Sequence, residues 1–173
     1  YITNFNQSKI QRVASDLDGT IEDVATLPSV GAPANRIEGN PDTSSDTIQF
    51  GSVGFPAPNA MVFDRSGNLY VSDSFQGAIY RIDNAQGCIA PCGVTTVLHH
   101  PLLATAGFPP FGANGLALSK DELTLFVANT GDDEEQSLKE LVPIGAPQLQ
   151  AHPSLWVGLA ADGLPITDQH RGW

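Results

Sequence analysis

Short apolar segments alternate with polar turns along this chain, and one such arrangement occurs twice. An apolar segment at 58–64, a polar turn at 65–68 and a second apolar segment at 69–73 have a counterpart at 113–129. In both copies the second apolar segment ends in Asp or Asn. Because short apolar runs on either side of a polar turn are typical of antiparallel pairs, the pattern predicts two β-hairpins.

The first hairpin continues into a longer unit. Residues 77–83 alternate apolar and polar side chains, and 94–98 follow after a Gly-rich turn, which predicts a four-stranded meander. Residues 1–13 match the second half of this unit, and 161–167 match its first strand. The predicted blade-like units cover 1–30, 56–100 and 112–160, with the start of a further unit at 161–173.

The unit length predicts the architecture. Tyr70 and Phe126 hold equivalent places 56 residues apart, and four-stranded repeats of roughly 50 residues are typical of β-propeller blades. The sequence therefore predicts an all-β fold: a single partial β-propeller domain over 1–173, with about three four-stranded blades of a six-bladed ring. Since known rings have about 4–8 blades, either the other blades are missing from this chain or two copies complete the ring as a homodimer.

Two inserts interrupt the repeat. Residues 31–54 are rich in Gly, Pro, Ser, Asp and Asn without periodicity, and we expect a loop there. Residues 130–147 begin with an acidic run, which is typical of a solvated turn.

Composition restricts the partners. The formal net charge is −11, and a surface this acidic repels phosphate backbones, which disfavours nucleic acid. No apolar run reaches the ~18–20 residues of a transmembrane helix, so we expect no membrane span.

Cys88 and Cys92, the only cysteines, enclose three residues. They can close a small disulfide loop, which would favour an oxidising compartment and thus secretion or the periplasm, or they can stay free. Two cysteines alone make a poor zinc site, because structural zinc takes four ligands.

The run Asp16-Leu17-Asp18-Gly19-Thr20 has the DxDGT pattern of haloacid-dehalogenase phosphatases. In those enzymes the first Asp ends a buried parallel strand, which is continuously apolar. Here the preceding residues 10–15 alternate, and no helical pattern follows. We therefore interpret the run as a turn between two strands.

Two quoted patterns carry a family resemblance. Gly67–Asp73 reads Gly-Asn-Leu-Tyr-Val-Ser-Asp, similar to NHL-repeat blades, and Asn114-Gly115-Leu116 resembles the inner strands of calcium-dependent six-bladed propellers. That family includes gluconolactonases (regucalcin-like proteins), paraoxonases and strictosidine synthase-like enzymes. The resemblance implies one Ca²⁺ or another divalent cation at the mouth of the central channel, held by Asn and Asp side chains where inner strands begin and by a Glu from the first blade.

Three positions match that implied site: Asn59, Asn114 and Asp162. Inner strands that run in one direction bring equivalent starting residues to one end, and Asn and Asp oxygens suit a hard cation. The resemblance also implies that an Asp ligand or a His assists proton transfer while the metal polarises a lactone or ester carbonyl, and Asp162 is the candidate for this role. The alternative is that each side chain only makes an Asx turn to its own backbone.

These features support two hypotheses. The first is a metal-dependent hydrolase that acts on a lactone or ester at the central channel. The second is a non-catalytic, NHL-like propeller that binds a protein or glycan.

Overall fold

The computed structural model describes residues 1–51, 54–104, 111–130 and 138–143. These residues form an all-β protein, without an α-helix in the described ranges. The strands are β1 (Ile2–Asn4), β2 (Lys9–Val13), β3 (Ile21–Thr26), β4 (Arg36–Gly39), β5 (Ser45–Ile48), β6 (Pro58–Phe63), β7 (Leu69–Asp73), β8 (Ala78–Ile82), β9 (Val94–His99), β10 (Ala113–Leu118), β11 (Thr124–Asn129) and β12 (Leu138–Pro143). Two short 3-10 helices are η1 (Phe5–Gln7) and η2 (Pro101–Leu103), and no helix in the described part of the chain is long and apolar enough to cross a membrane.

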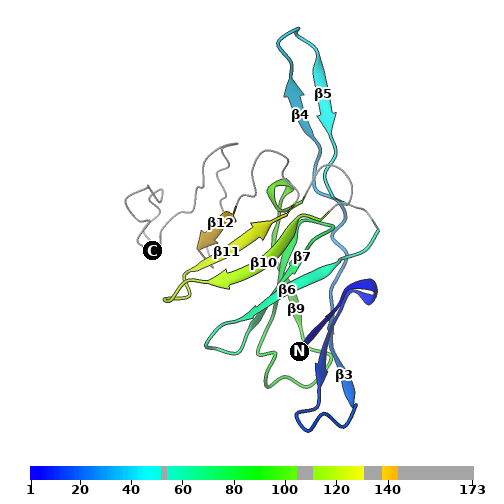
Figure 1. Ribbon diagram of the computed structural model, residues 1–173, viewed down its shortest axis with the longest axis vertical. Coiled ribbons are helices and arrows are strands. Elements are labelled where there is room, and N and C mark those ends of the chain that lie inside the picture. Colours follow the sequence, from blue (N-terminus) through cyan, green and yellow to red (C-terminus); the bar gives the residue numbers. More distant parts are fainter. Residues whose placement is uncertain (52–53, 105–110, 131–137, 144–173) are drawn as a thin grey trace.

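The strands form antiparallel sheets in chain order (Figure 1). The first unit is β1-β2-β3, the second is β6-β7-β8-β9 and the third is β10-β11-β12 as far as it is described. The predicted hairpins at 58–73 and 113–129 and the four-stranded meander at 56–100 are confirmed. The end of the third expected unit and the strand expected at 161–167 lie outside the described residues.

The repeat extends to the register of the first two strands of a unit. In the second unit Pro58 pairs with Asp73 and the register shifts before Met61. In the third unit Ala113 pairs with Asn129 and the register shifts before Leu116. The two hairpins thus have a β-bulge at the same position, which indicates that the second and third units repeat one structure and not only a similar composition.

The last two strands of a unit repeat in the same way. Lys9 of β2 pairs with Thr26 of β3, and a shift follows the next pair; Ala78 of β8 pairs with His99 of β9, and a shift again follows the next pair. The first unit is therefore the structural counterpart of β7-β8-β9, as the sequence match predicts.

The second unit lies between the other two. Alternate residues of β7 point to opposite faces, so Leu69 and Val71 join a core with Ile10 of β2, and Tyr70 joins a second core with Val127 of β11. All five residues of β7 are buried. The three units thus pack face to face, which explains why β7 is apolar on both sides.

The DxDGT run forms a turn between β2 and β3, as expected. The N–H of Leu17 donates to the carbonyl of Ala14 (3.0 Å), and the N–H of Thr20 donates to Oδ1 of Asp18 (2.7 Å). Leu17 and Gly19 take positive φ angles of 56° and 92°. Because β2 and β3 are antiparallel, Asp16 does not end a parallel strand, and the phosphatase arrangement is absent from this part of the structure.

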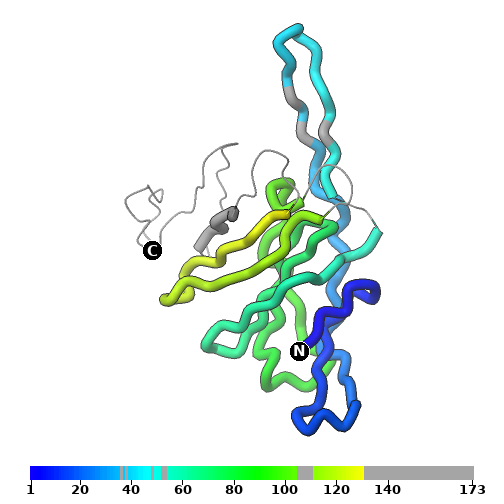
Figure 2. Tube along the Cα trace, in the orientation of Figure 1, coloured from blue at the N-terminus to red at the C-terminus, as the bar shows by residue number. Residues whose placement is uncertain are grey.

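The insert at 31–54, expected to be a loop, contains the two-stranded sheet β4–β5. This hairpin projects beyond the packed units in Figure 2. Its turn is closed by the N–H of Asn40, which donates to the carbonyl of Ser44 (2.8 Å), and by the Asn40 side chain. Ile37 is 72 % exposed, and Gly39, Ser45 and Thr47, which share its face of the hairpin, are exposed as well, and no apolar alternation marks these strands in the sequence.

The disulfide that the sequence left open is formed in the structure. Cys88 and Cys92 are bonded, and Cys92 lies in the core between the first two units. The N–H of Cys92 donates to the carbonyl of Val24 in β3 (2.8 Å), so the small loop also links the second unit to the first.

Candidate functional site

The structure brings two of the three predicted ligands to neighbouring strands. Asn59 and Asn114 are each the second residue of the first strand of a unit, in β6 and β10. β10 packs against β6 and β7, so both residues lie at the end of the units where these strands begin. Both side chains are half-buried. Asp162, the third predicted residue, lies outside the described residues.

Each asparagine is held by a hydroxyl group of its own hairpin. Nδ2 of Asn59 donates to Oγ of Ser74 (2.9 Å), and Nδ2 of Asn114 donates to Oγ1 of Thr130 (2.8 Å). Ser74 and Thr130 are the first residues after β7 and β11. The same side-chain hydrogen bond is therefore repeated in the second and third units.

The orientation of the Asn59 amide follows from the bonds of Ser74. Oγ of Ser74 donates its only proton to the carbonyl of Ala113 (2.6 Å), so it can only accept from Asn59. The Asn59 nitrogen must face Ser74, which turns Oδ1 away from it. Within the described ranges, Oδ1 of Asn59 and of Asn114 accept no hydrogen bond, so neither side chain makes an Asx turn there.

Further hydrogen bonds fix the second and third units relative to each other. Oγ of Ser72 donates to the carbonyl of Asn114 (2.6 Å), and the N–H of Gly112 donates to the carbonyl of Ser74 (2.8 Å). These bonds join the backbone of the third unit to the end of β7 beside both asparagines. The spacing of the two amides is consequently set by the packing of the units.

Two amide oxygens are a suitable but partial donor set for a hard cation. Ca²⁺ takes 6–8 oxygen ligands, including Asn carbonyls, so further oxygens are needed. The described residues contain no group of three or more His, Cys, Asp or Glu side chains that could hold a metal. The donor chemistry of Asn59 and Asn114 fits Ca²⁺ and not a thiolate- or imidazole-preferring metal.

A buried carboxylate, Asp73, lies at this end and was not predicted as a functional residue. It is fully buried, and its Oδ1 accepts from the backbone N–H groups of Ala57 (2.9 Å), Phe75 (2.9 Å) and Gln76 (3.1 Å). The Tyr80 hydroxyl lies 2.9 Å from the carbonyl of Pro28 and 3.3 Å from Oδ2 of Asp73. Asp73 thereby ties together the loops before β6 and after β7.

Burial decides the electrostatics of this network. It raises the pKa of the Asp73 carboxyl above its ordinary value, although the three backbone N–H groups act to lower it. Burial also raises the pKa of Tyr80, with the neighbouring Asp73 adding to the effect. In the sequence, the signal for Asp73 is the Asp or Asn that ends the second strand of each hairpin. Asn129 is the counterpart of Asp73 in the third unit, and its Nδ2 donates to the carbonyls of Leu102 (2.8 Å) and Ala104 (3.2 Å).

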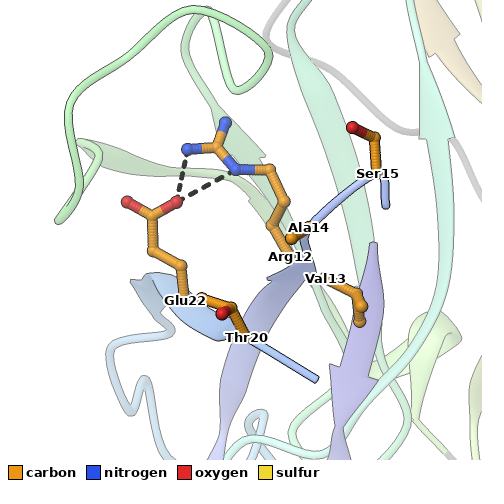
Figure 3. A pocket seen from close by; sticks show the side chains of 6 residues that line it. All are labelled: Arg12, Val13, Ala14, Ser15, Thr20 and Glu22. Carbon is orange, nitrogen blue, oxygen red and sulfur yellow. Dashed lines mark hydrogen bonds and ion pairs between the residues drawn. The ribbon is translucent and has the colours of Figure 1, made fainter. Parts of the chain in front are cut away.

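A surface pocket of about 410 Å³ lies at the opposite end of the first unit, by the turn between β2 and β3 (Figure 3). The guanidinium of Arg12 forms two hydrogen bonds to Glu22 across it, and Glu22 raises the pKa of Arg12. The Arg12 side chain is 31 % exposed and the Glu22 side chain 44 %, and such surface pairs contribute little to stability. The pocket is separate from Asn59 and Asn114, which are called the asparagine pair below.

Asn59, Asn114 and their hydroxyl partners Ser74 and Thr130 are therefore the candidate site. No family model matches the chain, and no curated protein matches it either.

Proposed function

We propose that the protein is a divalent-cation-dependent hydrolase of a lactone or ester, built on a β-propeller. The proposed ligands are Asn59, Asn114 and Asp162, the proposed ion is Ca²⁺, and the proposed site is the end of the units where the inner strands begin. The observation that carries the proposal is the repeated pair of an asparagine and a hydroxyl group, which leaves both amide oxygens unused by the described residues.

The packing of the units supports the propeller. In a propeller, four-stranded antiparallel sheets pack face to face around an axis, with their first strands innermost. Here β6 and β10 are the first strands of successive units and pack against each other, and the second unit has a core on each face. This arrangement brings equivalent residues of successive first strands close together at one end.

A cation at this end would polarise the carbonyl of the substrate. In the proposed reaction, water attacks the carbonyl carbon, the acyl C–O bond breaks and the leaving oxygen takes a proton, which yields a hydroxy acid or an acid and an alcohol. Ser74 and Thr130 hold the amides so that their oxygens need not reorganise. Asp162, which matches Asn114 in the sequence repeat, is the proposed base that accepts the proton of the attacking water.

The activity test is a pH-stat assay of lactone hydrolysis with Ca²⁺ or with EDTA. We expect Ca²⁺-dependent hydrolysis that falls at least about tenfold in Asn114→Ala, because one ligand is lost. Asn114→Asp is expected to retain activity, since it keeps the oxygen and Thr130 can donate to it. Asn40→Ser, in the turn of the β4–β5 hairpin, is the matched control. Hydrolysis that is indifferent to EDTA and to both Asn114 variants would refute the proposal.

The second candidate is a non-catalytic propeller that binds a protein or glycan. It is favoured by the state of Asp73, since this buried carboxyl group is held at Oδ1 by three backbone N–H groups, as is typical of a structural rather than a reacting group. Calcium binding without hydrolysis of any lactone or ester would support this candidate over the hydrolase.

A further inference from the structure

Four phenylalanines from separate segments form one cluster, the aromatic quartet of Phe5, Phe55, Phe75 and Phe111. The Phe75 ring lies 5.1 Å from Phe5, 5.5 Å from Phe55 and 5.7 Å from Phe111, measured between ring centroids. The Phe75 and Phe111 rings are stacked, with 21° between their planes. Half of the eight phenylalanines in the chain gather here.

The quartet lies at the same end of the units as the asparagine pair. Phe55 and Phe111 precede β6 and β10, while Phe5 and Phe75 follow β1 and β7. Figure 1 shows η1, which begins at Phe5, at this end of the first unit. The packing thus brings together residues from four segments that belong to all three units.

Ser74 connects the quartet to the asparagine pair. It accepts the Asn59 amide and directly precedes Phe75. Its carbonyl accepts the N–H of Gly112, which directly follows Phe111. Phe75 is therefore one residue from the hydroxyl group that orients Asn59, and Phe111 is one residue from the N–H that binds the Ser74 carbonyl.

Part of the quartet faces solvent. Phe55 is 38 % exposed and Phe111 is 36 % exposed, and Phe5 and Phe75 are half-buried. Phenyl rings offer no hydrogen-bonding group, so this surface cannot satisfy the hydroxyls of a sugar lactone. Exposed apolar surface beside polar groups is typical of ligand sites that take an apolar group. The net charge of −11 further disfavours an anionic ligand.

We infer that the aromatic quartet binds the alkyl or aryl substituent of a neutral lactone or ester whose carbonyl lies at the asparagine pair. This inference rests on the proposed hydrolase and specifies its substrate class: hydrophobic lactones and esters are favoured over polyhydroxylated ones. The apolar group packs on the rings, and the asparagine end receives the carbonyl.

Binding is tested with N-phenyl-1-naphthylamine, a neutral apolar fluorophore, on the full chain. We expect δ-dodecalactone to displace the probe, and D-glucono-δ-lactone to leave it bound. Phe55→Ala and Phe111→Ala are expected to weaken probe binding about tenfold, which corresponds to about 1.4 kcal/mol. Ile89→Ala is the control, because Ile89 is 94 % exposed within the disulfide loop and outside the quartet.

A second measurement needs no variant and so does not depend on their folding. For the unaltered protein, the displacing strength of δ-lactones should rise with alkyl length from δ-valerolactone to δ-dodecalactone. Displacement by gluconolactone, or equal displacement by all chain lengths, would overturn the inference. If the lactones displace the probe by chain length but none is hydrolysed with Ca²⁺, the hydrolase fails while the apolar binding surface stands.

Discussion

Replacing Asp73 by alanine is expected to destabilise the fold strongly, although no charged partner is lost. The substitution removes the acceptor for the N–H groups of Ala57, Phe75 and Gln76. Ala57 and Gln76 are fully buried, so two of these N–H groups lose their partner away from water. A buried unsatisfied group costs about 1–3 kcal/mol. The alanine variant no longer bears the desolvation cost of the buried carboxyl group, and this gain offsets part of the loss. We expect a loss of about 3 kcal/mol.

Asp73→Asn is the matched variant. Its Oδ1 can still accept the three N–H groups, and its Nδ2 can donate to the Tyr80 oxygen while the Tyr80 hydroxyl donates to Pro28. The third unit already carries an asparagine, Asn129, at this place. We expect Asp73→Asn to stay within about 1 kcal/mol of the unaltered protein.

The pH dependence of stability further distinguishes the carboxyl group of Asp73 from the amide group of Asp73→Asn. Because burial raises the folded-state pKa of Asp73, the folded protein holds this proton more tightly than the unfolded chain does. Its contribution to stability is thus greatest below the unfolded pKa of about 3.9 and falls as the pH rises towards the folded-state pKa. Asparagine has no such loss, so the stability of Asp73→Asn relative to the unaltered protein should increase from pH 4 to pH 7.

Urea unfolding followed by circular dichroism measures these free energies, and thermal melts should show a fall of about 10 °C for the alanine variant. An alanine variant as stable as the unaltered protein would refute the role assigned to the Asp73 network. So would an asparagine variant as unstable as the alanine one.

Two further predictions concern the backbone and the disulfide. Gly77→Ala should cost about 3 kcal/mol of stability, since φ is 62° and a Cβ there would lie within 3.0 Å of Ala104 atoms. Gly19→Ala should cost about 1 kcal/mol, since φ is 92° but a Cβ there would meet open space. Equal urea midpoints for the two variants would contradict the close packing at Gly77. Replacing Cys88 and Cys92 by serine should cost about 2 kcal/mol without reductant, from the loop that they close, and the difference should shrink when both proteins are melted in reductant.

The sequence was sufficient for most strands because turn residues mark their ends. β6 to β9 are found from apolar runs separated by polar or Gly-rich turns, and the DxDGT run is recognised as a turn from the alternation before it. The β4–β5 hairpin was missed because its sequence has no apolar alternation, and the strand face that carries Ile37 is exposed. Hydrophobic patterning cannot mark such a hairpin.

The candidate site was only partly accessible from the sequence for a different reason. Asn59 and Asn114 were predicted because the repeat places them in register, and their role as ligands stays a prediction. Asp73 and the aromatic quartet acquire their roles from contacts between residues far apart in the chain, such as Asp73 with Ala57 and Phe5 with Phe75. A pattern in one stretch of sequence does not report which loops meet at one end of three packed units.

The most direct measurement of the central claim is calorimetric titration of the full chain with CaCl₂. The account predicts one saturable binding event that weakens at least about tenfold in Asn114→Ala, the effect of losing one ligand, and is retained in Asn114→Asp and in the control Asn40→Ser. Absence of calcium binding, or binding that Asn114→Ala and Asn40→Ser leave equally unchanged, would contradict it.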